Sequence, residues 1–228
     1  MSNFGKSGRG GEGQNGGRQG GGHPYARDSA GAGGSVMEET EAGELETPHN
    51  SVKVSGTTDV NGLAQRICDL CRADNPPALL TIGNQSINQA VKGIAVAHAQ
   101  LASEGLDLSF QPAFRHVNRT KPLIAFYLST CPSGTTEMTQ ETELSVAAQS
   151  RITPVAGAIA GRIRDGLTVQ LTAIGVDAVT NAVLAAGNAR LFLEKDQLDI
   201  KLQPQFFKLT KNGVELSALR FTIISEPI

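Results

Sequence analysis

The chain has 228 residues, 20 lysines and arginines against 22 aspartates and glutamates, and a formal net charge of −2. Its 3 cysteines argue against a disulfide framework, and no stretch approaches the roughly 20 apolar residues of a membrane span. A disulfide-stapled secreted domain and a membrane-spanning protein are therefore excluded. We expect a cytoplasmic protein, with the nucleus as the alternative compartment, and no membrane partner.

Residues 1–48 are low in complexity, rich in glycine up to Gly34 and acidic afterwards. Too few hydrophobic side chains are present to offset the entropy of ordering, which predicts a disordered tail. Around Arg9 and Arg18 the tail is similar to the arginine–glycine segments of RNA-binding proteins, whose guanidinium groups bond phosphates and stack on bases. These two arginines are candidate RNA contacts, and a plain flexible linker is the alternative.

The stretch 81–102, TIGNQSINQAVKGIAVAHAQLA, recurs 92 residues later at 173–193 without a gap. A fixed offset that carries apolar positions and a glycine together indicates a duplicated unit. We predict a first domain at 49–130, a linker at 131–142 and a second domain at 143–228. Beyond Phe206 we expect the offset to become 96, so that the second hairpin is about four residues longer.

Apolar alternation predicts strands, and apolar residues spaced three to four apart predict helices. In the first unit we expect, in order, a strand at 51–55, a helix at 60–71, a strand at 78–82, a helix up to 102, and strands at 106–110 and 123–128. Thr58 or Asp59 can cap the first helix, and Asn84 or Ser86 the second. A basic hairpin at 114–122 connects the last two strands.

The second unit repeats the pattern. We expect a strand at 144–146, a helix that opens at Thr153-Pro154, a strand at 168–174, a helix at 177–193, and strands at 198–202 and 219–224. Each unit thus reads β-α-β-α-β-β, an α/β (α+β) two-layer sandwich. Each also carries two more basic than acidic residues, seven against five over 51–130 and nine against seven over 144–228, which permits a polyanionic partner.

Four segments of the first unit closely resemble the stage V sporulation protein S family: Ile82-Gly83, Asn88-Gln89-Ala90-Val91-Lys92, Gly105-Leu106-Asp107-Leu108 and Pro112-Ala113-Phe114. The resemblance covers about three-quarters of the chain and misses the tail. It implies the Alba-like fold of small nucleic-acid-binding proteins that dimerise, and hence an intramolecular pseudo-dimer. The second unit departs from the pattern, with Thr180-Asn181 and Leu184 in place of the Asn-Gln pair and the lysine.

Basic residues on the two hairpins are the main candidates for contact, because paired β-arms can flank a duplex and each cation can neutralise a phosphate. The candidate residues are Arg115, Arg119 and Lys121 in the first hairpin, Lys208 and Lys211 in the second, Lys53 and Arg151 near the first helices, and Lys92 on the second helix. The alternative is that exposed hairpins are commonly charged without any binding role.

Other patterns with chemical potential favour structural roles. Cys68 and Cys71 lie inside a predicted helix in its apolar phase, without a second pair, so we expect core packing rather than metal binding. His98 aligns with Arg190 and is expected at a helix interface. Asp107 and Asp199 recur at equivalent strand positions, but no base or nucleophile accompanies them. We therefore expect no catalytic residue, no metal site and no cofactor.

The sequence thus predicts a protein that binds nucleic acid without catalysis, RNA more than DNA because of the tail. The competing interpretation is a structural or interaction protein that oligomerises through small residues on its helix faces. Those residues are Gly93, Ala95, Ala97, Ala185, Ala186 and Gly187. The positions of the two basic hairpins, on one face or apart, discriminate between the two interpretations.

Overall fold

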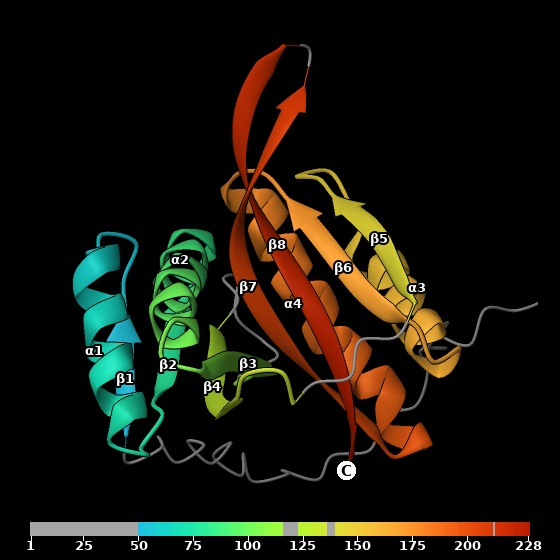
Figure 1. Ribbon diagram of the computed structural model, residues 1–228. Coiled ribbons are helices and arrows are strands. Elements are labelled where there is room, and N and C mark those ends of the chain that lie inside the picture. The colour runs from blue at the N-terminus through green and yellow to red at the C-terminus, as the bar shows by residue number, and fades with distance from the viewer. Residues whose placement is uncertain (1–49, 116–122, 136–139, 212) are drawn as a thin grey trace, which may run out of the picture. The chain divides into compact units, whose positions relative to one another are not determined.

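The computed structural model describes residues 50–115, 123–135, 140–211 and 213–228, with the backbone alone for Lys211, and all of them belong to one compact unit (Figure 1). The elements are β1 (Ser51–Val54), α1 (Val60–Arg72), β2 (Ala78–Ile82), α2 (Asn84–Ala102), β3 (Leu106–Phe114), β4 (Leu123–Pro132), β5 (Glu141–Val146), α3 (Ile152–Arg164), β6 (Thr168–Ala173), α4 (Val176–Leu193), a 3-10 turn (Glu194–Asp196), β7 (Leu198–Lys211) and β8 (Val214–Pro227). The predicted β-α-β-α-β-β order is confirmed in both repeats.

The described strands form one eight-stranded sheet in the order β1-β2-β4-β3-β7-β8-β6-β5. Each half of this order is the mirror of the other, and the halves meet where β3 and β7 pair antiparallel. The residues that pair there are Phe110 and Leu202, which are equivalent by the 92-residue offset. A pseudo-twofold axis therefore passes between them, and the two repeats associate as the subunits of a symmetric dimer do.

The register corrects the expected offset in the last strand. Ile124 pairs with Thr81 in the first repeat, and Leu219 pairs with Ala173 in the second. Since Thr81 and Ala173 are 92 apart, Ile124 and Leu219 are equivalent at an offset of 95. The prediction of 96 was wrong, and the second hairpin is three residues longer than the first.

The helices cover one face of the sheet, because α2 and α4 touch each other and each contacts both central strands. Side chains that alternate along β3 and β7 supply the core under them, including Phe110 and Leu202, both fully buried. The Phe110 ring lies 5.1 Å from that of Phe126 and 6.4 Å from that of Phe221 in the second repeat. The two repeats therefore share one continuous core. The α/β two-layer fold predicted for each unit is confirmed.

Only one of the predicted helix N-caps is observed. Asp59 caps α1 as expected, its Oδ2 accepting from the Gly62 N–H at 2.6 Å. The caps expected at Asn84 or Ser86 and at Thr153 were wrong. Gly83 and Arg151 are the N-cap residues of α2 and α3, and neither helix has a side-chain cap.

Gly83 and Gly175 are equivalent and have the same unusual backbone. Their φ/ψ angles are 85°/168° and 87°/165°, a region that essentially only glycine occupies. We expect Gly175→Ala to lower the free energy of unfolding by about 1–3 kcal/mol through backbone strain alone, since its Cβ would meet no neighbour.

Gly157→Ala is the matched control for that change. Gly157 lies exposed inside α3, and an added Cβ meets nothing there either. That change should stabilise by about 0.5–1 kcal/mol. Urea unfolding of both variants measures the difference, and equal effects from the two alanines would contradict the strain argument.

Candidate nucleic-acid interface

The first hairpin is described only at its base. Arg115 follows β3 directly, and its Nη1 donates to the Tyr127 hydroxyl at 3.0 Å. Tyr127 lies on β4, so this bond fixes the guanidinium beside the open face of the sheet. Arg119 and Lys121 lie outside the described residues, as do Arg9 and Arg18 of the tail.

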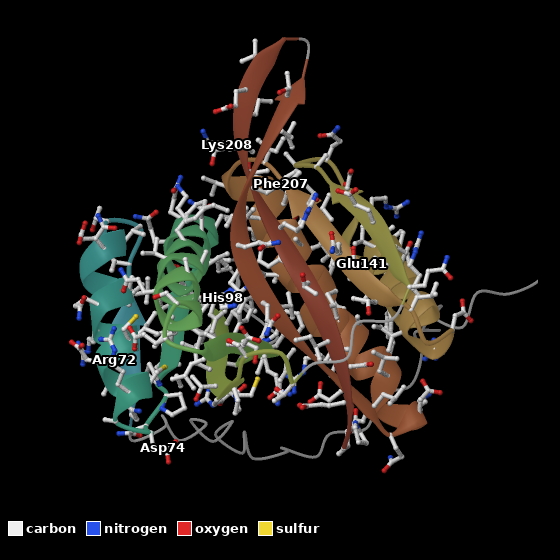
Figure 2. The ribbon with its side chains drawn as sticks, viewed as in Figure 1. Arg72, Asp74, His98, Glu141, Phe207 and Lys208 are labelled. Carbon is white, nitrogen blue, oxygen red and sulfur yellow. The ribbon has the colours of Figure 1, made fainter. Side chains whose placement is uncertain are left out.

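The second hairpin projects past the rest of the sheet, and Figure 2 shows Phe207 and Lys208 where it begins to do so. The Lys208 ammonium lies 2.8 Å from a Glu215 carboxylate oxygen, and both side chains are well exposed. An exposed ion pair of this kind contributes roughly 0–1 kcal/mol to the free energy of unfolding. A phosphate can therefore take the place of Glu215 beside Lys208 with little loss of stability. For Lys211 only the backbone, at the end of β7, is described.

The two hairpins lie at opposite ends of the sheet, because β3 and β7 are antiparallel and each hairpin extends from the carboxyl end of its strand. Arg115 lies five residues beyond Phe110, and Lys208 lies six residues beyond Leu202. At about 3.3 Å per residue the backbone positions of Arg115 and Lys208 are roughly 36 Å apart along the strand direction. The hairpins therefore lie apart, at opposite ends of the sheet, and do not converge, so the criterion set by the sequence does not by itself favour nucleic-acid binding over the interaction protein.

The three remaining candidates are dispersed. Lys53 is exposed on the edge strand β1, and Arg151 is exposed at the start of α3. Lys92 is partly buried on α2. Among the described residues none of the three has an ion-pair partner, so each cation is available to an anion.

A symmetric network of polar side chains lies where the two repeats meet. The sequence singled out some of these side chains but did not predict their partners. His98 Nδ1 lies 3.1 Å from the Pro204 carbonyl oxygen, and Arg190 Nη1 donates to the Pro112 carbonyl at 2.8 Å. Both side chains and both prolines are related by the offset of 92. Figure 2 shows His98 between α2 and β7. His98 was expected at a helix interface, but the groups that it contacts lie on the strands β3 and β7.

The recurring aspartates complete the network. Asp199 accepts from Arg190 Nε at 2.6 Å and from Gln111 Nε2 at 3.0 Å, and Asp107 lies 3.7 Å from His98 Nε2. Burial opposes ionisation of Asp199, but the bonds from Arg190 and from the Ile200 N–H outweigh it and hold the pKa of the carboxyl below its ordinary value. Asp199 thus joins the repeats through Gln111, whereas Asp107 contacts His98 of its own repeat.

The cysteine pair packs in the core of the first repeat. Cys68 is fully buried and Cys71 nearly so. Burial, which is the largest effect on its ionisation, raises the pKa of the Cys71 thiol to about 11 and disfavours the reactive thiolate. Both cysteines therefore lie in the environment expected of side chains that pack in the core.

Two cavities lie at equivalent places beside the junction. The larger, of about 950 Å³, is lined by residues that include Phe114, Thr180, Leu184 and Arg190. The smaller, of about 320 Å³, is lined by Phe206, Asn88 and Lys92, which are equivalent to the first three, together with residues of β6, β8 and the start of α4. The sequence interpretation included Lys92 but missed Asn88 and Phe206.

A model of the stage V sporulation protein S family matches residues 50–123 and 142–226, together more than half of the chain. The chain belongs to this family. The two matches are two tandem copies of the family unit, and they confirm the resemblance seen in the sequence. The domain boundaries at 49–130 and 143–228 stay predictions.

The stage V sporulation protein S units differ in the polar residues of their second helix. At the position of Asn88 and Lys92 in α2, the second unit has Thr180 and Leu184 in α4. The two cavities are therefore equivalent in place and different in polarity. None of the helices in the described parts of the chain is long and apolar enough to cross a bilayer.

Proposed function

We propose that this protein binds nucleic acid without catalysing a reaction, contacting phosphates through the two basic hairpins and through its Gly/Arg-rich tail. The observation that carries the proposal is the placement of one hairpin at each end of a single sheet. The backbone positions of Arg115 and Lys208 at the bases of the hairpins are roughly 36 Å apart, close to the helical turn of B-form DNA of about 34 Å; this spacing supports binding to a duplex and does not choose RNA over DNA. Two arms so spaced meet phosphates one turn apart.

RNA is the preferred ligand in this proposal because the tail resembles arginine–glycine segments, which bind RNA without imposing a shape. The cytoplasm, or else the nucleus, is then the compartment of action. Backbone and shape recognition is favoured over base reading, because the described part of the sheet carries Tyr127 as its one tyrosine and the chain has no tryptophan.

The competing interpretation needs small-residue helix faces that are free for a second copy. Gly93 packs against Leu63, where an added Cβ would lie 2.7 Å from a methyl carbon, and Gly187 packs against the Phe114 ring. The alanines beside them are buried within the chain: Ala95, Ala97, Ala185 and Ala186. These faces are covered from within the chain, at Gly93 inside the first repeat and at Gly187 across the junction, which supports the binding function over oligomerisation through them.

The test is equilibrium binding of labelled single- and double-stranded RNA and DNA to the full chain and to a chain that begins at Thr47. We expect both proteins to bind, with RNA preferred by the full chain and the preference reduced in the shorter one. Binding that disappears entirely with the tail would make the folded units a scaffold. Absence of binding to all four ligands would refute the proposal and leave the interaction protein.

A further inference from the structure

The smaller cavity has the chemistry of a phosphate site. Asn88 and Lys92 lie four residues apart, on one face of α2, and both line it. Asn88 is only 4% exposed, and its amide makes no hydrogen bond within the described residues. Other buried polar groups of these helices are satisfied, such as Ser86, which donates to the Gly83 carbonyl, and Thr180, which donates to the Val176 carbonyl.

The fully buried polar atoms without a partner among the described residues are Gln203 Nε2 and Arg220 Nε; the Asn88 amide is not one of them, because it faces the solvent of the cavity. A ligand that accepts a hydrogen bond from Asn88 replaces that solvent. The Lys92 ammonium, which has no ion-pair partner among the described residues, makes an anion the fitting acceptor.

The part of the cavity wall formed by the second repeat also favours an anion. The helix α4, 18 residues long, begins in this wall at Gly175 and Val176, and no side chain caps its first N–H groups. Uncapped N–H groups and the helix dipole favour an anion at that end. Asp177, the acidic residue of the first turn, is not part of the wall; its carboxylate accepts from Asn84, which lines the larger cavity.

An aromatic ring borders the same cavity. Phe206 is 48% exposed, whereas its equivalent Phe114 packs its ring against Gly187. The residue equivalent to Gly187 is Ala95, and a Cβ at Gly187 would lie 3.0 Å from the Phe114 ring. The Ala95 methyl group therefore prevents the same close packing of Phe206, and its ring face is left for a planar ligand group.

We propose that this cavity binds one nucleotide unit of a nucleic-acid strand, with its phosphate between Lys92, Asn88 and the start of α4 and its base against Phe206. The inference deepens the proposed function and rests on it for the source of the nucleotide. The site needs both repeats, since α2 comes from the first and α4, β6 and β8 from the second. Among the described residues it occurs once, because Thr180 and Leu184 replace Asn88 and Lys92 in the equivalent cavity, and the Arg190 that lines that cavity is paired with Asp199.

The experiment titrates the full chain with adenosine 5′-monophosphate, ribose 5-phosphate and inorganic phosphate by calorimetry, and with a single-stranded RNA oligonucleotide by fluorescence. Lys92→Gln removes the charge and keeps a similar length. Asn88→Thr combined with Lys92→Leu installs the residues that the second repeat already carries. Phe206→Leu removes the ring, and Lys195→Gln, at an exposed lysine outside the cavity, is the control for net charge.

We expect Lys92→Gln and the double variant to weaken adenosine monophosphate and oligonucleotide binding at least tenfold, and Lys195→Gln to change it less than twofold. Phe206→Leu should weaken binding of the nucleotide and leave that of ribose 5-phosphate unchanged. Thermal unfolding of each variant checks that it folds. If the double variant does not fold, Lys92→Gln alone decides.

Nucleotide binding unchanged by Lys92→Gln would overturn the inference, even if the protein binds RNA. Nucleotide binding that depends on Lys92 and Phe206 in a protein that binds no polymer would support the cavity and refute the proposed function. Oligonucleotide binding that ignores Lys92→Gln while mononucleotide binding is abolished would overturn the assignment to a strand and indicate a free nucleotide.

Discussion

Phe110→Ala should lower the free energy of unfolding by about 3–5 kcal/mol, the usual cost of removing a buried phenylalanine ring. Phe110 is fully buried, sits where the two repeats pair, and contacts rings of both. Because the core is continuous, we expect one cooperative transition, shifted to lower denaturant, and not the separate melting of one repeat. Urea unfolding followed by circular dichroism measures both the shift and the number of transitions.

Phe207→Ala is the matched control. Its ring is only partly buried on the projecting hairpin, with the Arg220 guanidinium carbon 3.6 Å from its centroid. Removing this cation–π interaction costs about 0.5–1 kcal/mol. Two transitions in Phe110→Ala, or a destabilisation no larger than the control's, would contradict a single shared core.

Arg190→Ala should destabilise the protein by about 2–4 kcal/mol, somewhat less than the 3–5 kcal/mol of a fully buried pair. The change leaves the Asp199 carboxylate without its guanidinium and the Pro112 carbonyl without its donor. The side chains of the pair are 23% and 20% exposed, so water compensates only in part.

The destabilisation should depend on pH. The folded pKa of Asp199 lies below its ordinary value of 3.8, so the pair stabilises the protein above that pH, and the contribution disappears as pH falls through the folded pKa. The difference between wild type and Arg190→Ala should therefore be largest near neutral pH and shrink below about pH 4. Unfolding in urea at several pH values measures it.

Arg164→Ala is the control for that experiment. Its guanidinium also bonds a carboxylate, Asp196 at 2.7 Å, and a carbonyl, that of Phe192, but the pair is 44% and 37% exposed. We expect a destabilisation of about 0–1 kcal/mol. Equal effects in the two variants would mean that the junction network adds nothing beyond a surface ion pair.

The bounds of an element were predicted best where its apolar pattern in the sequence coincides with its burial in the structure. The strand Ala78–Ile82 was predicted at its observed bounds, because a short apolar run lies between a proline and a glycine. Strands of the hairpins were predicted too short. β7 continues to Lys211, beyond the helices, where cross-strand hydrogen bonds persist but no core imposes apolar alternation.

The junction could not be predicted from local pattern. The offset of 92 relates His98 to Arg190 and Asp107 to Asp199, yet it does not say which faces of the repeats meet. That information lies in the pairing of Phe110 with Leu202, a long-range contact. The sequence did contain one indication of the junction. A basic side chain, an aspartate and a proline all recur at the same offset, and core packing alone does not require polar residues to recur in this way.

The central claim is that the hairpins of the folded units bind nucleic-acid phosphates. Its most direct test is the salt dependence of double-stranded RNA and DNA binding by the full chain, compared with a variant in which five residues are changed to alanine. Those residues are Arg115, Arg119, Lys121, Lys208 and Lys211. A variant with Arg66→Ala and Lys195→Ala, exposed positions outside the hairpins, is the control.

We predict that the hairpin variant flattens the plot of log K against log salt by roughly 0.7–0.9 for each phosphate that its side chains no longer neutralise, and that the control leaves the slope unchanged. An unchanged slope in the hairpin variant, with binding retained, would contradict the account and place the site on the tail or elsewhere on the folded units.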